Sequence, residues 1–387
     1  MHVPTIWTDP PATWSPSSLH AIEACPRRWQ LAASRWGEHD RFPERIHPAA
    51  VEGRIVHEAL ERLVKALGAR GRPAIGSPSF RDAVEESGFF EFFASELERW
   101  DAAVDRPFTS SRRSRITPME LANRAVRALR ATYLQGDGVT PEVDAAARPT
   151  SSQSNSTDGS TLLEALRARG VLTEITVRHP RLPFVGVIDQ VVRDVDGVRV
   201  VDFKTGSEKP GHVDQVHAYA VAWWRSTGVL PMSAVLQYPG TRIDVALDER
   251  TLQSFERRLE SRIDAAREAL LARPAPCIPS EACRHCVVRA RCDEGWETVA
   301  TRDPGSAPVG SIDLELEVLQ APSATGFVAT AATHEVHVVY EASVGRAMPA
   351  MHAGEHVRLS SATRRGDGGI EIGSWTDLHI GPVALPP

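Results

Sequence analysis

The stretch FVGVIDQVVRDVDGVRVVDFKTG, residues 184–206, constrains the fold more than any other part of this chain. Runs rich in Val flank the pair Asp196-Gly197. An Asp-Gly pair between such runs is a strong signal for a two-residue β-hairpin turn. A turn of that length pairs Val195 with Val198. The sequence therefore predicts two antiparallel strands in a defined register.

The register of this hairpin predicts a charged patch. Counting back from the turn places Asp189 opposite Lys204, with Asp202 as a diagonal neighbour on the same face. Directly opposed residues have Cβ atoms about 5 Å apart, and two carboxylates that close repel each other unless a cation lies between them. Oxygen ligands suit Mg²⁺ or Mn²⁺. Lys204 could then stabilise charge that develops on a phosphate, or help to deprotonate a water.

An ordinary ion pair on an exposed strand face is the alternative interpretation of these charges. The use of lysine in this chain argues against it. The chain has 44 lysines and arginines, and only Lys65, Lys204 and Lys209 are lysines. We expect a simple ion pair in so arginine-rich a chain to use Arg, and therefore favour a metal site.

Apolar periodicity predicts an α/β fold for the first 300 residues. Strands are expected over residues 171–205. Residues 136–161 consist largely of Gly, Ser, Thr, Asn, Asp and Pro, which predicts a flexible insertion. The expected helices cover residues 15–36, 49–67, 82–101, 117–134, 212–226 and 249–272.

The last part of the chain predicts a second domain. Residues 1–300 form the first domain, residues 301–308 a linker, and residues 309–387 a set of alternating, β-rich runs that ends in a glycine-turn hairpin. The length and the five or so expected strands predict a small OB-like barrel, a fold that commonly binds single strands. A small barrel that docks to protein fits this pattern almost as well.

Three of the five cysteines lie within EACRHCVVRARC. The spacing of Cys283, Cys286 and Cys292 is typical of a metal or iron–sulfur centre, and such centres take four protein ligands. Cys277 would complete a local zinc site. Cys25 would complete a site that joins the two ends of the domain. The spacing alone excludes neither zinc nor iron.

The chain is expected to be soluble and cytoplasmic. It has no run of about 18 apolar residues, and its N-terminus lacks the pattern of a signal peptide. The net charge of −6 gives no general attraction to nucleic acid, so any basic contact surface would be local. The arginines that could follow a phosphate backbone, or form an ordinary solvated face, are Arg112, Arg113, Arg115, Arg124, Arg127 and Arg130.

The central segment resembles the active-site signature of the PD-(D/E)xK nuclease superfamily, in particular its RecB-like branch. GVID and DFK match its acidic and lysine positions, GRIVHEALERL supplies an upstream histidine, and QVHAY supplies a Gln-x-x-x-Tyr helix. The resemblance implies a mixed sheet flanked by helices and metal-dependent cleavage of DNA. The catalytic residues that it implies are Asp189, Asp202, Lys204, Gln215 and Tyr219. The implied metal ligands are His57, Asp189, Asp202 and the carbonyl of Phe203, with Glu174 as a further acid nearby.

One subset of the RecB-like nucleases resembles this chain in its cysteines as well. This subset, similar to the CRISPR-adaptation and AddB-type enzymes, has a Cys-Pro-Arg-Arg-aromatic helix near its start and a Cys-x2-Cys-x5-Cys group after the nuclease core. The resemblance implies a 4Fe-4S cluster on Cys25, Cys283, Cys286 and Cys292 that staples the ends of the domain, with Cys277 as the spare cysteine. A zinc-stapled form of the same enzyme is the alternative.

The expected activity is hydrolysis of DNA by an exonuclease that acts on single strands or ends, in repair, recombination or phage defence. The chain contains no G-x-x-x-x-G-K-[ST] loop, so a helicase or other motor is expected to act in trans. The alternative is a catalytically idle, DNA-binding scaffold subunit of a helicase–nuclease complex. The complete catalytic set argues against it, because a degenerate domain would be expected to have lost at least one of these residues.

Overall fold

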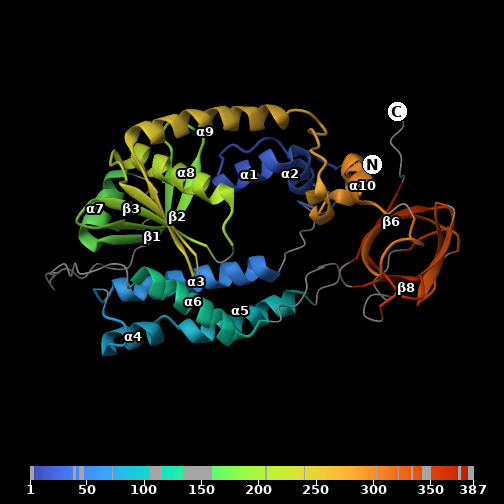
Figure 1. Ribbon diagram of the computed structural model, residues 1–387, viewed down its shortest axis with the longest axis horizontal. Helices are drawn as coiled ribbons and strands as arrows, with labels where there is room; N and C mark the ends of the chain where they lie inside the picture. The colour runs from blue at the N-terminus through green and yellow to red at the C-terminus, as the bar shows by residue number, and fades with distance from the viewer. Residues whose placement is uncertain are drawn as a thin grey trace.

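The computed structural model describes residues 4–37, 41–42, 48–71, 73–104, 116–133, 159–204, 207–238, 240–301, 303–320, 322–332, 334–341, 350–373 and 376–381. Figure 1 shows a β-sheet between two layers of helices, with a β-barrel at one end of the molecule. Of the helices described, none is long and apolar enough to span a bilayer.

Two short helices, α1 (Pro16–Ala24) and α2 (Pro26–Ala33), replace the single helix predicted from residue 15 to 36. The break lies at Cys25, whose backbone is extended, because proline disfavours the helical conformation in the residue before it. The Cys25 sulfur instead caps α2 by accepting a hydrogen bond from the backbone N–H of Arg28. Cys25 therefore lies at a junction between helices and not on a helix face.

Four helices form the layer below the sheet in Figure 1 and share a hydrophobic core of their own. Residues 82–101 were predicted as one helix, but the chain turns at Gly88, which adopts a φ of +59° that glycine tolerates best. The buried side chains of Leu63, Phe93 and Leu121 contribute to this core. The four helices are α3 (Pro48–Gly68), α4 (Pro78–Glu86), α5 (Phe89–Val104) and α6 (Pro118–Tyr133).

A five-stranded sheet in the order β1-β2-β3-β4-β5 forms the centre of the first domain. β2 and β3 are antiparallel, whereas β3 and β4 are parallel and are joined by the crossover helix α8. β4, β5 and α7 were not predicted. The strands are β1 (Val171–Arg178), β2 (Val185–Arg193), β3 (Val198–Phe203), β4 (Ser233–Gln237) and β5 (Arg242–Ala246). The helices on this side are α7 (Gly159–Arg169), α8 (Pro210–Thr227) and α9 (Glu249–Ala269).

Most of the predicted insertion at residues 136–161 lies outside the described residues. Its last three residues begin α7, whose Leu162 and Leu166 are buried in the core beneath α8. The end of the polar segment is therefore helical, because the apolar side chains that follow it pack against the sheet half of the molecule.

The turn between β2 and β3 differs from the prediction. The Asp194 carboxylate accepts hydrogen bonds from the backbone N–H groups of Asp196 and Gly197, and the backbone N–H of Asp194 donates to the carbonyl of Gly197. An aspartate that bonds the backbone two and three residues ahead stabilises a longer turn. The hairpin thus has a four-residue connection, and the predicted two-residue turn was wrong.

The longer turn shifts the predicted register by two residues. Gln190 pairs with Val201, so the pairing continues to place Asp189 opposite Asp202 and not opposite Lys204. A shift of two leaves every side chain on the face where it was predicted, because the side chains of a strand alternate with a period of two. The two carboxylates are therefore even closer neighbours than the sequence indicated.

A closed β-barrel follows the first domain, as the sequence predicted. Its strands close in the order β6-β7-β8-β10-β9-β6, because β10 pairs with both β8 and β9. A further strand, β11, pairs antiparallel with β9. Its core is separate from the other cores. The strands are β6 (Gly310–Val318), β7 (Gly326–Ala331), β8 (His334–Tyr340), β9 (His356–Arg364), β10 (Ile370–Ile372) and β11 (Asp377–Ile380).

The cysteine segment lies between the sheet domain and the barrel. It consists of the short 3₁₀ helices η1 (Glu281–His285) and η2 (Arg289–Arg291), followed by α10 (Asp293–Val299). From η2, Arg289 makes a buried, two-pronged ion pair with Asp313 of β6, at 2.7 and 3.0 Å. The barrel is thus bound directly to the segment that carries three cysteines.

The predicted linker at residues 301–308 is also bound to the barrel where it is described. The backbone N–H of Thr301 donates to the carbonyl of Asp313 at 2.7 Å. Arg364 of β9 donates to the carbonyls of Pro304 and Gly305. These bonds hold the connection against the barrel surface.

Candidate active site

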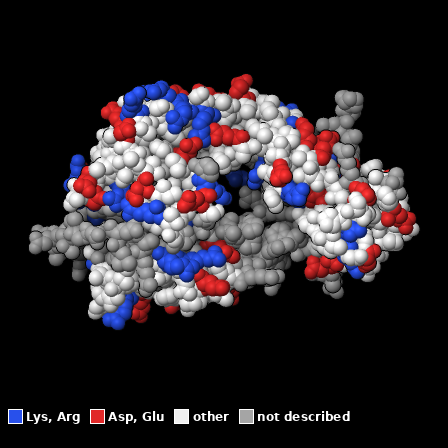
Figure 2. All heavy atoms as spheres, viewed as in Figure 1, with Lys and Arg blue, Asp and Glu red and all other residues white. Residues whose placement is uncertain are grey.

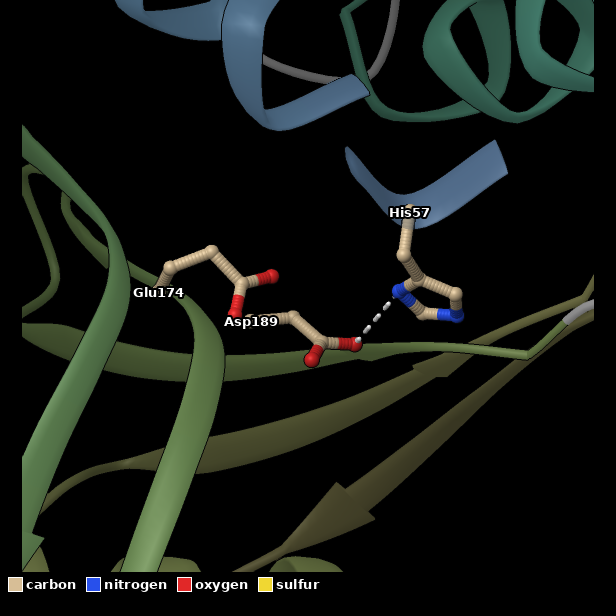
Figure 3. A group of neighbouring side chains, drawn as sticks. All are labelled: His57, Glu174 and Asp189. Carbon is tan, nitrogen blue, oxygen red and sulfur yellow. Dashed lines mark ion pairs between the residues drawn. The ribbon is translucent and has the colours of Figure 1, made fainter. Parts of the chain in front are cut away.

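Two carboxylates on neighbouring strands define the centre of the candidate site. Asp189 extends from β2 and Asp202 from β3. His57 reaches toward Asp189 from α3, a helix of the lower layer (Figure 3). The His57 Nδ1 atom lies 3.9 Å from the Asp189 Oδ2 atom. The fold therefore brings together residues separated by more than 130 positions in the chain.

Burial makes this pair of carboxylates electrostatically costly. Asp202 is 2% exposed, and burial together with the neighbouring Asp189 raises its pKa. Burial also raises the pKa of Asp189, although a hydrogen bond from the backbone N–H of Phe203, at 2.7 Å, opposes this rise. Two buried carboxylates that both tend to keep a proton form a site that a divalent cation would stabilise.

Glu174 adds a third carboxylate, and it lies in an unusual backbone conformation. β1 pairs with β2 on both sides of Glu174, which places it opposite Asp189. Its φ of +48° is rare for a residue with a side chain, and such conformations cluster at functional sites. Burial, and secondarily the charge of Asp189, raises the pKa of Glu174 to about 7. The sequence indicated this residue only as a further acid nearby.

The three side chains His57, Glu174 and Asp189 form a candidate metal-binding group. One ligand atom from each lies within 4.8 Å of the others, and Figure 3 shows the histidine ring directed at the two carboxylates. Burial lowers the pKa of His57, so its ring is neutral at pH 7 and has a lone pair available for a metal. Carboxylate oxygens with one imidazole fit Mg²⁺ or Mn²⁺.

A pocket opens at this group, between the sheet and the lower helices. Phe203, a predicted metal ligand through its carbonyl, lies in its wall. The lining residues are His57, Leu60, Glu61, Val64, Leu129, Thr173, Glu174, Asp189, Gln190 and Phe203.

Lys204 lies at the end of a chain of hydrogen bonds. Its Nζ atom lies 2.7 Å from Asp202 Oδ2 and donates to the side-chain oxygen Oε1 of Gln215 at 2.7 Å. The Gln215 amide in turn donates to the Tyr219 hydroxyl at 2.7 Å. The Tyr219 ring packs on Gly186 of β2, where an added Cβ would lie 2.7 Å from the ring. The structure thus brings the predicted lysine, glutamine and tyrosine into one connected group.

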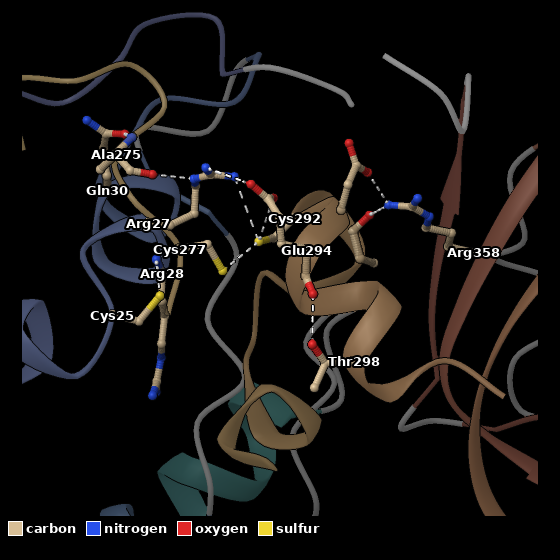
Figure 4. A network of polar contacts seen from close by, with 12 residues as sticks. Cys25, Arg27, Arg28, Gln30, Ala275, Cys277, Cys292, Glu294, Thr298 and Arg358 are labelled. Atoms are coloured by element: carbon tan, nitrogen blue, oxygen red, sulfur yellow. Dashed lines mark hydrogen bonds and ion pairs between the residues drawn. The ribbon is translucent and has the colours of Figure 1, made fainter. Parts of the chain in front are cut away.

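Cys25, Cys277 and Cys292 lie near one another, but not in the predicted arrangement (Figure 4). The Cys277 and Cys292 sulfurs are 3.5 Å apart, so the cysteine that was predicted to be spare contacts a predicted ligand. Among the residues described, no three cysteines bring their sulfurs within 4.8 Å of one another. The cysteines as placed do not fit a metal or cluster ligand set, and the iron–sulfur prediction is not confirmed.

A polar network joins the ends of the first domain at this place. Arg27 of α2 makes a two-pronged ion pair with Glu294 of α10, at 2.9 and 3.1 Å, and also bonds the carbonyl of Ala275. Gln30 accepts a hydrogen bond from the backbone N–H of Ala275. The connection between the two ends, which the sequence assigned to a cluster, is therefore made at least in part by Arg27 and Gln30.

The arginines predicted to follow a phosphate backbone receive little support. Arg124 is held by Glu52 of α3 at 3.0 Å, so it serves helix packing. Arg127 is exposed on α6. The remaining positions lie outside the described residues or have undescribed side chains: Arg112, Arg113, Arg115 and Arg130.

A mixed sheet that presents opposed carboxylates and a lysine from adjacent strands, with a histidine above them, is the architecture of a metal-dependent nuclease. The chain belongs to the PD-(D/E)XK nuclease superfamily, whose family model matches residues 13–293. No curated protein matches the chain.

Two solved structures show local likeness at low identity. The crystal structure of SSO0001 is 17% identical, with a TM-score of 0.20; the match covers 35% of this chain and 65% of that one, so the chain spans about two thirds of its length. The alkaline exonuclease LHK-Exo from Laribacter hongkongensis is 17% identical, with a TM-score of 0.19; the match covers 46% of this chain and 94% of that one. Overall similarity at this level carries no argument about function.

Proposed function

We propose that this chain is a divalent-metal-dependent DNA nuclease that hydrolyses phosphodiester bonds, in single strands or at DNA ends. One observation carries the proposal. Two carboxylates, the buried Asp202 and the half-buried Asp189, lie opposite each other on neighbouring strands, and the Lys204 ammonium lies 2.7 Å from Asp202. A purely structural ion pair needs only one of these carboxylates, because burying a second one beside it costs stability.

The ion would be held by groups from four elements of the fold, α3, β1, β2 and β3. His57, Glu174 and Asp189 form the group described above, and Asp202 with the Phe203 carbonyl would complete it. A bound divalent ion supplies charge stabilisation for the phosphate and a more acidic water. Glu174 must lose its proton to act as a ligand, which it does as the pH rises through about 7.

The remaining residues would act on the phosphate and on each other. Lys204 places a positive charge where negative charge develops on the phosphate. The Gln215 side chain accepts a hydrogen bond from the Lys204 ammonium and donates one to the Tyr219 hydroxyl. These two residues would therefore position Lys204. We also propose that Gln215 and Tyr219 position the DNA strand, as the resemblance implies.

The finer assignments rest on the sequence. Exonuclease action, a role in repair, recombination or phage defence, and a helicase or other motor in trans follow from the resemblance and from the lack of a P-loop. We also propose that residues 1–300 and 309–387 are separate domains and that the second is OB-like. The separate core and the closed order of five strands support this division.

Digestion of end-labelled and circular DNA, single- and double-stranded, with Mn²⁺ tests the nuclease proposal. Wild-type protein should degrade at least the linear single strand. Lys204→Ala should reduce the rate by two orders of magnitude or more, while DNA affinity and the circular dichroism spectrum stay unchanged. DNA binding without cleavage by the wild type would favour the idle scaffold, and full activity of Lys204→Ala would refute the assigned site.

The iron–sulfur cluster is a separate proposal that rests on the resemblance of the cysteine pattern to that of one subset of RecB-like nucleases. We propose Cys25, Cys283, Cys286 and Cys292 as its ligands, with zinc and Cys277 as the alternative. Anaerobically purified protein should be brown and contain about four irons per chain, and Cys25→Ser should remove the colour. A colourless protein with about one zinc per chain, sensitive at Cys277 and not at Cys25, would contradict the cluster.

A further inference from the structure

A second group of basic and aromatic side chains lies beside Lys204. The backbone N–H of Lys204 donates to the carbonyl of Gln237, the last residue of β4, at 2.8 Å. Tyr238 follows directly, and its hydroxyl lies 2.7 Å from Nδ1 of His212, in the first turn of α8. The ends of β3 and β4 and the start of α8 therefore meet at one place.

The contact with Tyr238 bears on the tautomer of His212. The Tyr238 hydroxyl lies 2.7 Å from His212 Nδ1 and can donate its proton to a neutral ring there. Burial, together with the charges of Lys204, Lys209 and His20, lowers the pKa of His212, so the ring is neutral at pH 7. A neutral ring that accepts at Nδ1 carries its proton on Nε2. In the described part of the chain, no hydrogen bond to this Nε2 is formed.

Lys209 and His20 supply two further basic side chains. Lys209 is exposed and makes no ion pair with a described residue. His20 extends from α1, and its ring lies 3.7 Å from the position that a Cβ would take at Gly211. The ring of His20 therefore lies next to the start of α8, and residues from two helices converge there.

The distribution of lysine singles out the same region. Of the chain's 44 lysines and arginines only three are lysines. Each lies near a titratable side chain of the candidate active site or of the group around His212. Lys65 acts on Glu174, Lys204 pairs with Asp202, and Lys209 acts on His212. Figure 2 shows Lys and Arg atoms at the rim of a hollow in the middle of the visible face, between the sheet half and the lower helices.

We propose that Lys209, His212 and His20 form a phosphate-binding subsite that holds the nucleic-acid backbone beside the bond that is cleaved. The Nε2–H of His212 and the ammonium of Lys209 donate to the oxygens of one phosphate, and His20 lies at its edge. Tyr238 positions His212. The inference rests on the proposed function, because it places the substrate strand next to Lys204.

Binding of a fluorescein-labelled single strand of about 20 nucleotides, measured without divalent metal so that cleavage does not occur, tests the subsite. Lys209→Ala should weaken binding several-fold and reduce the salt slope, d log K/d log[salt], by about 0.7 for one lost phosphate contact. His212→Phe keeps the ring but removes the donor, and should weaken binding with little change in slope. Arg257→Ala, on the exposed face of α9, is the matched control and should change neither quantity.

A third variant works in the opposite direction and cannot be explained by misfolding. The carboxylate of Glu208 is near enough to Tyr238 for its charge to raise the pKa of the tyrosine. Glu208→Gln removes this negative charge beside the subsite and should therefore tighten DNA binding. In the Mn²⁺-dependent reaction, Lys209→Ala should raise KM several-fold and leave kcat within about twofold, as expected for uniform binding of substrate and transition state. Wild-type affinity and salt slope in both Lys209→Ala and His212→Phe would overturn the subsite. A wild type that binds but does not cleave would overturn the nuclease proposal alone.

Discussion

The ion pair between Arg289 and Asp313 makes a strong prediction about how the barrel and the cysteine segment depend on each other. Both side chains are nearly fully buried, at 4% and 6% exposure. Arg289 also bonds Ser361, whose backbone N–H donates to Asp313 at 2.7 Å. Asp313→Ala would leave the guanidinium buried without its partner, which costs about 3–5 kcal/mol.

This cost should appear locally, as faster hydrogen exchange in the cysteine segment. A loss of about 3 kcal/mol corresponds to an increase of about 100-fold or more in the exchange rates of amides that open with the segment. The reference is Asp264→Ala, which breaks an exposed pair with Arg267 on α9 and should change little. Protection unchanged in Asp313→Ala would refute the view that this pair stabilises the segment. Replacing both partners together by Met and Leu should restore much of the stability.

Three further predictions concern the candidate site. Gly186→Ala should destabilise the protein by about 1–3 kcal/mol and reduce kcat, because the new Cβ would displace the Tyr219 ring; urea unfolding and single-turnover rates would show this. Lys204→Arg should be as inactive as Lys204→Ala, since a wide guanidinium cannot replace a compact ammonium. The melting temperature of metal-free protein should fall as the pH rises from about 4.5 to about 7, because Glu174 binds its proton more tightly when folded, and Glu174→Gln should weaken that dependence.

The carboxylate pair and its lysine could be predicted from the sequence because the signal is local. A Val-rich hairpin with period-two alternation determines which side chains share a face, and the face survives a register error of two residues. The turn itself could not be predicted in detail, because the Asp194 carboxylate accepts hydrogen bonds from the backbone N–H groups of Asp196 and Gly197 and so stabilises a longer turn. Asp-Gly pairs favour the shorter turn only where no preceding aspartate caps it.

Features that depend on tertiary contacts escaped the prediction. Nothing local distinguishes Glu174 from other strand acids, since its conformation depends on its place opposite Asp189. The helix break at Cys25 had a readable signal in the proline that follows it, as did the break at Gly88. The buried pair of Arg289 and Asp313 ties the cysteine segment to the barrel, a connection that the spacing of the cysteines did not indicate.

The charges in the described part of the barrel favour a role in bracing the cysteine segment. A phosphate backbone is bound mainly through Lys and Arg. The described barrel strands and turns contain three such residues, and each is engaged: Arg358 with Asp293, Arg364 with linker carbonyls, and Arg365 with Asp367. The basic side chains near Lys204 are better placed to bind the strand. Asp313→Ala should therefore lower stability while leaving the salt slope of DNA binding close to that of the wild type, and a slope that fell by about one contact would favour a DNA-binding barrel.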